Sequence, residues 1–419
     1  MPNFTMQPCN QESSPLKFEI STQAIRVGQY PDMSDTHCEP IAMTSAYVFA
    51  SAADAAGKFS GAKPGNVYSR FTNPTVKSFE QRVACMEGAE DGVAFSSGMA
   101  AIVAIAHAWL AAGKNVVCSR DVFGTTLTAF RHYFGKLGAD VRVVSLVDIE
   151  DWRIAIDNNT AFVFLETPSN PILNVAAIAQ IAHLAHSCGA KVVVDNTLLT
   201  PILQNPLKHG ADVVVHSAGK YIDGQGRCVA GVVLGSERLM ADIRAVIRVM
   251  GASLSPMDAW LLLKSLETLD LRMAAISRNA QQLARWLCLQ PKIGRVYYTG
   301  LSEHPQYEIA CSQQSGHGGV VSFEVGSGRE CAWHLIDSLN LISIATSIGD
   351  TRTMVTHPAS TTHGKLTPLE RERAGVSERL VRLSVGLESP ADITNDLEVA
   401  LSNVHVLQDN LVQLALVAA

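Results

Sequence analysis

The sequence predicts an α/β protein whose larger part is a mostly parallel sheet covered by helices. Between residues 92 and 235, short runs rich in valine alternate with segments of helical periodicity. This alternation is typical of strand–helix–strand units, and therefore of parallel strands. The 419 residues are 47% hydrophobic, which is ordinary for a globular protein with a large buried core. A smaller α+β part is expected to follow the sheet.

Six apolar runs are the expected strands of the large sheet. Each is rich in β-branched residues and is bounded by polar or turn-forming residues. They lie at residues 115–118, 141–145, 161–166, 191–194, 212–215 and 231–234. In open sheets of this kind ligands bind beyond the carboxyl ends of the strands. Polar residues at those ends are therefore candidates for a functional site.

Residues 1–60 are expected to form an arm on a neighbouring subunit. Most of this segment is irregular and rich in polar and small residues, so a flexible tail is the alternative. Residues 41–49, however, are too apolar to stay in water. We therefore expect the arm to pack on another copy of the chain, and residues 61–256 to form the large domain.

Residues 257–287 have the periodicity of one long amphipathic helix. This helix is expected to lead into a C-terminal α+β domain, residues 257–419. Two strands are expected there, at residues 319–325 and 379–385, and a final helix begins near Pro390.

Charge and motif content narrow the range of ligands. The net charge is −6 and no dense cluster of Lys and Arg occurs, which argues against nucleic acid or an anionic membrane surface as a partner. No apolar segment is long enough to span a bilayer, and the N-terminus lacks the pattern of a secretory signal, so a cytoplasmic protein is expected. Neither C-x-x-C nor H-E-x-x-H occurs, and no metal site is predicted.

Two polar residues near strand ends suggest a cofactor. Lys220 follows the run at 212–215 and opens into a glycine-rich loop, and Asp195 ends the run at 191–194. Pyridoxal phosphate needs an amine that forms a Schiff base with its aldehyde, and a carboxylate that keeps its ring nitrogen protonated. Taken singly, such residues are more often a solvated lysine and a turn aspartate. Their shared position favours the cofactor.

A phosphate site is expected where Ser97, Gly98 and Met99 lead into a helix. The N-terminus of a helix has unpaired N–H groups and a favourable dipole, and both attract an anion. An ordinary helix cap is the alternative for these residues.

An ordered series of motifs extends over nearly the whole chain. The motifs are Tyr68 to Thr75 (YSRFTNPT), Ser97 to Ala100 (SGMA), Glu166 to Pro171 (ETPSNP), Asp195 to Thr197 (DNT), Lys220 to Gly226 (KYIDGQG), Thr362 with His363, and Arg382 to Glu388 (RLSVGLE). This series resembles the cystathionine γ-synthase family, or Cys/Met metabolism family, of fold type I pyridoxal phosphate enzymes. Such an ordered set is highly specific.

The resemblance implies roles for the matched residues. The implied cofactor contacts are Tyr68, Arg70, Ser97, Gly98, Met99, Phe123, Asp195, Thr197, Ser217 and Lys220. The implied substrate contacts are Asn170, Ser347, Arg352 and Arg382, and Arg382 would bind the substrate α-carboxylate through two parallel hydrogen bonds. Tyr68 and Arg70 would reach the site from a neighbouring subunit, which implies a homotetramer built from two active dimers.

The chain departs from the family at two cofactor contacts. Members commonly have S-x-T-K where this chain has Gly219 before Lys220, so one hydroxyl contact to the phosphate, worth about 1 kcal/mol, is missing. Phe123 replaces a tyrosine, and its ring can stack on the cofactor but has no phenol to exchange protons. Lyases of the family use that phenol, and the methionine-cleaving members have a cysteine in place of Thr125. Lyase chemistry is therefore less expected.

Residues 347–354 favour one reaction. Their sequence, SIGDTRTM, is similar to the G-D-T-[KR]-T segment of the O-acylhomoserine sulfhydrylases. The insertions usual in the acetyl-using branch are absent, which favours O-succinylhomoserine. The resemblance thus implies γ-replacement, in which sulfide displaces succinate to form homocysteine for methionine biosynthesis. Arg352 would meet the distal succinyl carboxylate, with a surface ion pair as the alternative.

The sequence leaves other reactions open. A cystathionine γ-synthase would use cysteine in place of sulfide, and an O-acetylhomoserine sulfhydrylase would use the acetyl ester. A γ-lyase would cleave its substrate without a second reactant. A binding protein that kept the α/β fold without a cofactor is the alternative outside enzymes.

Overall fold

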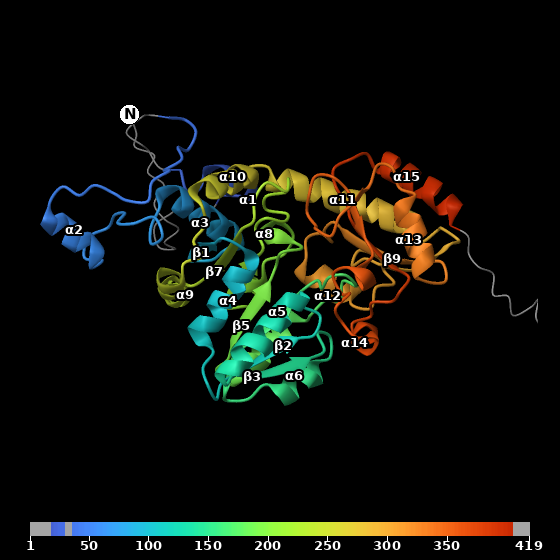
Figure 1. The fold of residues 1–419 in the computed structure, drawn as a ribbon, viewed down its shortest axis with the longest axis horizontal. Coiled ribbons are helices and arrows are strands. Elements are labelled where there is room, and N and C mark those ends of the chain that lie inside the picture. The colour runs from blue at the N-terminus through green and yellow to red at the C-terminus, as the bar shows by residue number, and fades with distance from the viewer. Residues whose placement is uncertain (1–17, 30–35, 405–419) are drawn as a thin grey trace, which may run out of the picture.

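A seven-stranded sheet lies at the centre of the larger part of the molecule (Figure 1). The structure is a computed structural model, and it describes residues 18–29 and 36–404. The strands are β1 (Asp91–Phe95), β2 (Asn115–Ser119), β3 (Asp140–Val144), β4 (Thr160–Glu166), β5 (Lys191–Asp195), β6 (Val213–His216) and β7 (Gly231–Gly235). Their order is β1-β7-β6-β5-β4-β2-β3, and only β7 runs antiparallel to its neighbours. The predicted mostly parallel sheet is confirmed, and so are its six predicted strands.

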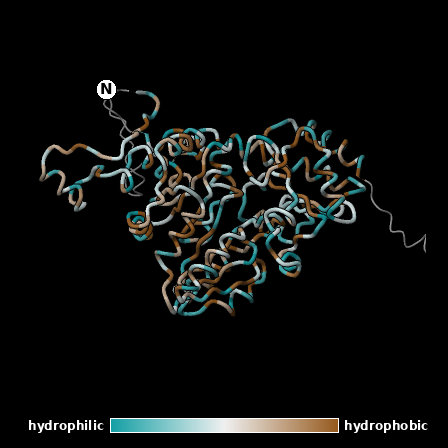
Figure 2. Tube along the Cα trace, viewed as in Figure 1, coloured by the Kyte–Doolittle hydropathy of each residue, from teal (hydrophilic) through white to brown (hydrophobic). Residues whose placement is uncertain are grey.

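Helices cover both faces of this sheet because successive strand residues point to opposite sides. Val193 and Val215 pack on one face with α4 (Gly98–Trp109) and α9 (Glu237–Met250), whereas Val192 and Val194 pack on the other. That second face is covered by α6 (Ile149–Ala155) and α7 (Ile178–Ser187), and α3 (Pro74–Glu87) covers the β1 end. Hydrophobic and hydrophilic stretches accordingly alternate along the trace in Figure 2.

A five-stranded sheet of order β10-β11-β12-β9-β8 forms the smaller part. Its strands are β8 (Ile293–Tyr297), β9 (Val320–Val325), β10 (Ser343–Ile344), β11 (Met354–Thr356) and β12 (Leu380–Ser384), and α13 (Arg329–Asp337) and α15 (Pro390–Asn403) pack with them. The two predicted strands and the final helix of this part are confirmed. The division at residues 60 and 256 stays a prediction.

The prediction of one helix over residues 257–287 is wrong. Two helices, α10 (Pro256–Leu266) and α11 (Leu269–Leu287), follow each other along one side of the molecule in Figure 1. Between them Thr268 has φ −116° and ψ 5°, outside the helical range. The buried guanidinium of Arg272 donates to the carbonyl of Ser265 at 3.0 Å, which helps to end α10. An apolar pattern carries no sign of such a bond.

The part of the predicted arm that carries α2 (Ala52–Phe59) extends away from the body of the molecule in Figure 1, whereas α1 (Ile20–Arg26) packs on α3 with Ala24 buried. Val48 is 96% exposed and Met43 is 67% exposed. Residues 1–17 and 30–35 of the predicted arm lie outside the described residues. Packing of the arm on another copy stays a prediction. Within the described ranges, no helix combines the length and the apolar run needed to cross a membrane.

Candidate active site

Lys220 lies in the loop after β6, where the two parts of the molecule meet. Its Nζ donates to Ser347 Oγ of the smaller part at 2.8 Å. Burial, and then the charge of Arg382, lower the pKa of this amine below its ordinary value. The structure therefore holds Lys220 half-buried with a weakened preference for the protonated form.

Gly349 lets the two loops approach closely. It has φ +83°, and a Cβ at this position would lie 2.5 Å from the main-chain nitrogen of Tyr221. Two residues further on, the N–H of Thr351 donates to the carbonyl of Gly224 at 2.9 Å. A side chain at position 349 would push the loops apart and take Ser347 away from Lys220.

Asp195 and Glu166 end the adjacent strands β5 and β4 in direct register. Both carboxyl groups are buried. Burial raises the pKa of Asp195, although hydrogen bonds from Thr197, including its N–H at 3.0 Å, and the nearby His216 act in the opposite direction. A nearby cationic partner, such as a protonated ring nitrogen, would stabilise the ionised form of such a buried carboxyl group.

The predicted phosphate site is formed where the N-terminus of α4 meets the loop after β6. A Cβ on Gly98 would lie 3.0 Å from Ser217 Oγ, so only glycine permits this approach. The side chain of Ser97 caps α4 by accepting the N–H of Ala100 at 3.0 Å, which was the alternative considered for it. The first N–H groups of the helix, including that of Met99, have no acceptor within the helix, so they are available to donate hydrogen bonds to an anion.

Thr197 connects this site to Asp195. Its Oγ1 accepts the N–H of Ser217 at 2.8 Å, while its own N–H donates to Asp195. The structure thus brings Asp195, Thr197, Ser217 and Lys220 together along the ends of β5 and β6.

Arg382, on β12, provides a buried cation beside Lys220. It donates to Asn170 Oδ1 at 3.1 Å and to the carbonyls of Thr346 and Ser347 at 2.7 and 3.0 Å. Its Nε has no partner, and no carboxylate pairs with it among the residues that the structure describes. Burial lowers the pKa of Arg382 to about 10. Because an uncompensated buried charge is costly, this group suits a substrate carboxylate.

Three predicted contacts, Tyr68, Arg70 and Arg352, have their described polar or ring contacts with residues outside this site. Arg352 is 73% exposed and pairs with Asp350 at 3.3 Å. Arg70 donates to the carbonyl of Arg248, and its guanidinium lies 5.7 Å from the ring centre of Tyr68. These contacts leave the predicted role of Tyr68 and Arg70 at a neighbouring subunit's site untested.

Two residues near the site had no role assigned from the sequence. Glu166 accepts the N–H of Phe123 through Oε2 at 2.9 Å, and its position at a strand end was the available signal. His363 lies near Arg382, and burial together with that charge lowers the pKa of its imidazole to about 4. Its place in a matched motif was the only signal for it.

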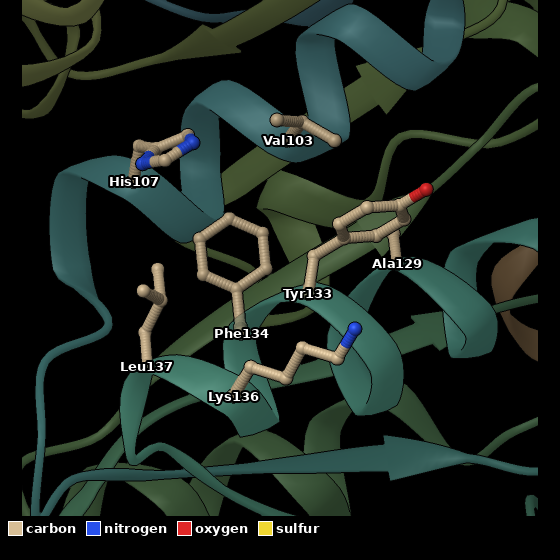
Figure 3. A pocket seen from close by; sticks show the side chains of 7 residues that line it. All are labelled: Val103, His107, Ala129, Tyr133, Phe134, Lys136 and Leu137. Atoms are coloured by element: carbon tan, nitrogen blue, oxygen red, sulfur yellow. The ribbon is translucent and has the colours of Figure 1, made fainter.

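The surface pocket in Figure 3 is separate from this site. It has a volume of about 540 Å³ and lies between α4 and the π-helical segment Ala129–Phe134. It is lined by Val103, His107, Ala129, Tyr133, Phe134, Lys136 and Leu137. None of the predicted site residues is among them.

The residues present fit pyridoxal phosphate. An amine of lowered pKa, a buried carboxyl group at a neighbouring strand end, and a glycine-lined helix N-terminus lie at one edge of the sheet. The unpartnered Nε of Arg382 adds a place for a substrate carboxylate at the same edge.

The chain is similar to known proteins along most of its length. Residues 21–402 match the family described as Cys/Met metabolism PLP-dependent enzyme. A protein of Pseudomonas aeruginosa named O-succinylhomoserine sulfhydrylase is 50% identical, with 90% of this chain and 94% of that protein covered. An L-methionine gamma-lyase of Pseudomonas putida is 41% identical, with 91% and 97% covered.

A solved structure gives the same result for the fold. The putative O-acetylhomoserine (thiol)-lyase of Campylobacter jejuni, solved with N′-pyridoxyl-lysine-5′-monophosphate, has a TM-score of 0.89 and 32% identity, and the match covers 92% of this chain and 100% of that one.

Gly219 gives a prediction for the lysine loop. A Cβ there would lie 2.5 Å from the carbonyl oxygen of Cys228. We expect Gly219→Thr to lower the urea midpoint of unfolding and to weaken pyridoxal phosphate binding, instead of adding a phosphate contact, because the loop containing Cys228 must move. Gly328→Thr is the matched control, since a Cβ there meets nothing within 4 Å. Tighter cofactor binding by Gly219→Thr, measured by titrating the apoprotein, would contradict this expectation.

Proposed function

We propose that this chain, which belongs to the Cys/Met metabolism family of PLP-dependent enzymes, converts O-succinyl-L-homoserine and sulfide to L-homocysteine and succinate. The half-buried Lys220 and Ser347 lie together with the buried Arg382, and the buried Asp195 ends a strand at the same edge of the sheet, which supports amino-acid chemistry at this site. The 50% identity to a protein named O-succinylhomoserine sulfhydrylase supports the choice of substrate. The segment at residues 347–354 agrees with that choice.

The cofactor has a defined place in this proposal. When bound, pyridoxal phosphate supplies an electron-withdrawing ring that makes the carbon atoms of an attached amino acid more acidic. Lys220 would bind its aldehyde, and Asp195 would hold the proton of its ring nitrogen. Ser217 and the N–H groups at Gly98 and Met99 would bind the phosphate.

The chain's own groups would then direct proton transfer. Arg382 would bind the α-carboxylate and set the orientation of the substrate. The amine of Lys220, whose pKa is lowered, loses its proton more readily than an ordinary lysine, and the neutral amine could accept a proton from one carbon and return it to the next. Ser347 accepts a hydrogen bond from this amine and so fixes its direction. Phe123 has no acidic hydrogen, which leaves these transfers to Lys220.

The reaction is tested by product identification. The purified holoenzyme is supplied with O-succinylhomoserine and either sulfide or cysteine, and separately with methionine alone. We expect homocysteine and succinate from sulfide, and a loss of at least about 1,000-fold in Lys220→Ala. Cystathionine as the main product from cysteine would indicate a γ-synthase. Release of methanethiol from methionine at a higher rate than homocysteine forms from sulfide would indicate a lyase. The relative named L-methionine gamma-lyase makes this outcome worth testing.

The substrate contact proposed for Arg352 has its own test. Its guanidinium is exposed, and its ion pair with Asp350 lies at the surface. Because an exposed ion pair contributes little to stability, Arg352 could leave Asp350 and turn toward a ligand at a low cost in free energy. We expect Arg352→Ala to raise KM for the succinyl ester about tenfold and to leave KM for the acetyl ester nearly unchanged. Arg295→Ala, at an exposed position of β8, is the control. An unchanged preference between the esters would leave Arg352 with only its ion pair.

We further propose that the enzyme is a cytoplasmic homotetramer of two active dimers, in which Tyr68 and Arg70 complete a neighbouring subunit's site. The exposed side chains of Met43 and Val48 support an interface on the arm. We expect Met43→Asp combined with Val48→Asp to give a lighter species in light scattering after size exclusion. Ile154→Asp, at an exposed position of α6, should leave the mass unchanged. Equal masses for all variants would exclude this role of the arm.

A further inference from the structure

We propose that Glu166 is a positioning residue that ties Phe123 to the cofactor site, and that Glu166 and Asp195 together carry a single negative charge. The inference rests on the proposed function only in so far as the site binds pyridoxal phosphate. It holds for any reaction that the site catalyses.

The geometry places Glu166 between two elements of the site. Glu166 and Asp195 are register partners on parallel strands, so their side chains leave the sheet on the same side. Glu166 Oε2 accepts the main-chain N–H of Phe123 at 2.9 Å. Phe123 directly precedes α5 (Gly124–Thr128), so this bond sets the position where α5 begins.

The surroundings of Glu166 favour its neutral form. The side chain is only 5% exposed, and no cationic group pairs with it among the described residues. Asp195 and Asp121 face it as acidic groups, the thiol of Cys118 lies on the adjacent β2, and His216 faces Asp195. Burial, and then the charge of Asp195, raise the pKa of Glu166 well above its ordinary value. Two adjacent buried carboxyl groups do not both ionise readily.

Hydrogen bonding decides which carboxyl group keeps the charge. Asp195 accepts the N–H of Thr197 and has His216 nearby, and both favour its ionised form. Among the residues that the structure describes, Glu166 accepts only the N–H of Phe123, through Oε2, which leaves Oε1 to carry a proton. A neutral Glu166 keeps the charge on Asp195 for the ring nitrogen of the cofactor. Its bond to Phe123 also holds a ring that has no hydroxyl of its own to anchor it.

The test compares two substitutions at one position. Glu166→Gln keeps an oxygen acceptor for Phe123 and cannot ionise, whereas Glu166→Ala removes the acceptor. We expect Glu166→Gln to bind pyridoxal phosphate within about twofold of the wild type, and Glu166→Ala to bind it at least about tenfold more weakly, which corresponds to one lost hydrogen bond to a buried group. Cofactor binding is measured by titrating the apoprotein.

The pH dependence of stability tests whether Glu166 is protonated in the folded protein. A folded-state pKa above the unfolded value means that the wild type holds a proton that the unfolded chain releases above about pH 4.5, so its stability falls as the pH rises toward the folded pKa. The urea midpoint of the wild-type apoprotein should therefore fall relative to that of Glu166→Gln as the pH rises above about 4.5. Glu150→Gln, at an exposed position of α6, should show no such divergence.

The outcomes separate this inference from the proposed reaction. Equal loss of cofactor affinity in Glu166→Gln and Glu166→Ala, or midpoints that do not diverge with pH, would overturn the role of Glu166. A holoenzyme that binds the cofactor as expected but forms no homocysteine would overturn the proposed reaction and leave the inference standing.

Discussion

The close contact between the loop after β6 and the loop that begins at Ser347 is the constraint on which the site depends. Lys220 lies in the loop that follows β6 of the large sheet, whereas Ser347 and Arg382 belong to the smaller part. The contact exists because Gly349 presents no side chain to Tyr221. Without this approach the amine would lie near the strand ends of the large sheet, but the groups suited to the substrate would not face it.

Charge is distributed unevenly across the site. Two cationic groups, Lys220 and Arg382, lie close enough that the charge of Arg382 lowers the pKa of Lys220, and burial lowers the pKa of both groups. The acidic groups Asp195 and Glu166 lie together at neighbouring strand ends. Such a site is costly for the protein alone and becomes balanced when anionic and cationic ligand groups bind at the two places.

Much of this arrangement could be predicted from the sequence because it follows from periodicity and strand ends. The valine-rich runs predict the strands, and a parallel sheet brings Asp195 and the loop of Lys220 to one edge. The break after α10 could not be predicted, since it depends on a hydrogen bond from Arg272 to the main chain. The bond from Phe123 to Glu166 joins residues distant in sequence, and the close approach of Gly219 to Cys228 depends on how one loop folds back on itself, so no local pattern indicates either of them.

Arg272 also connects helix α11 to the loop that contains Lys220. From the first turns of α11 its guanidinium grips the carbonyls of Tyr221 and Ile222, the two residues that follow Lys220. If α11 tilted, the two hydrogen bonds from Arg272 would move the main chain of Tyr221 and Ile222 with it. A displacement of α11 relative to the large sheet would therefore also displace the main chain next to Lys220.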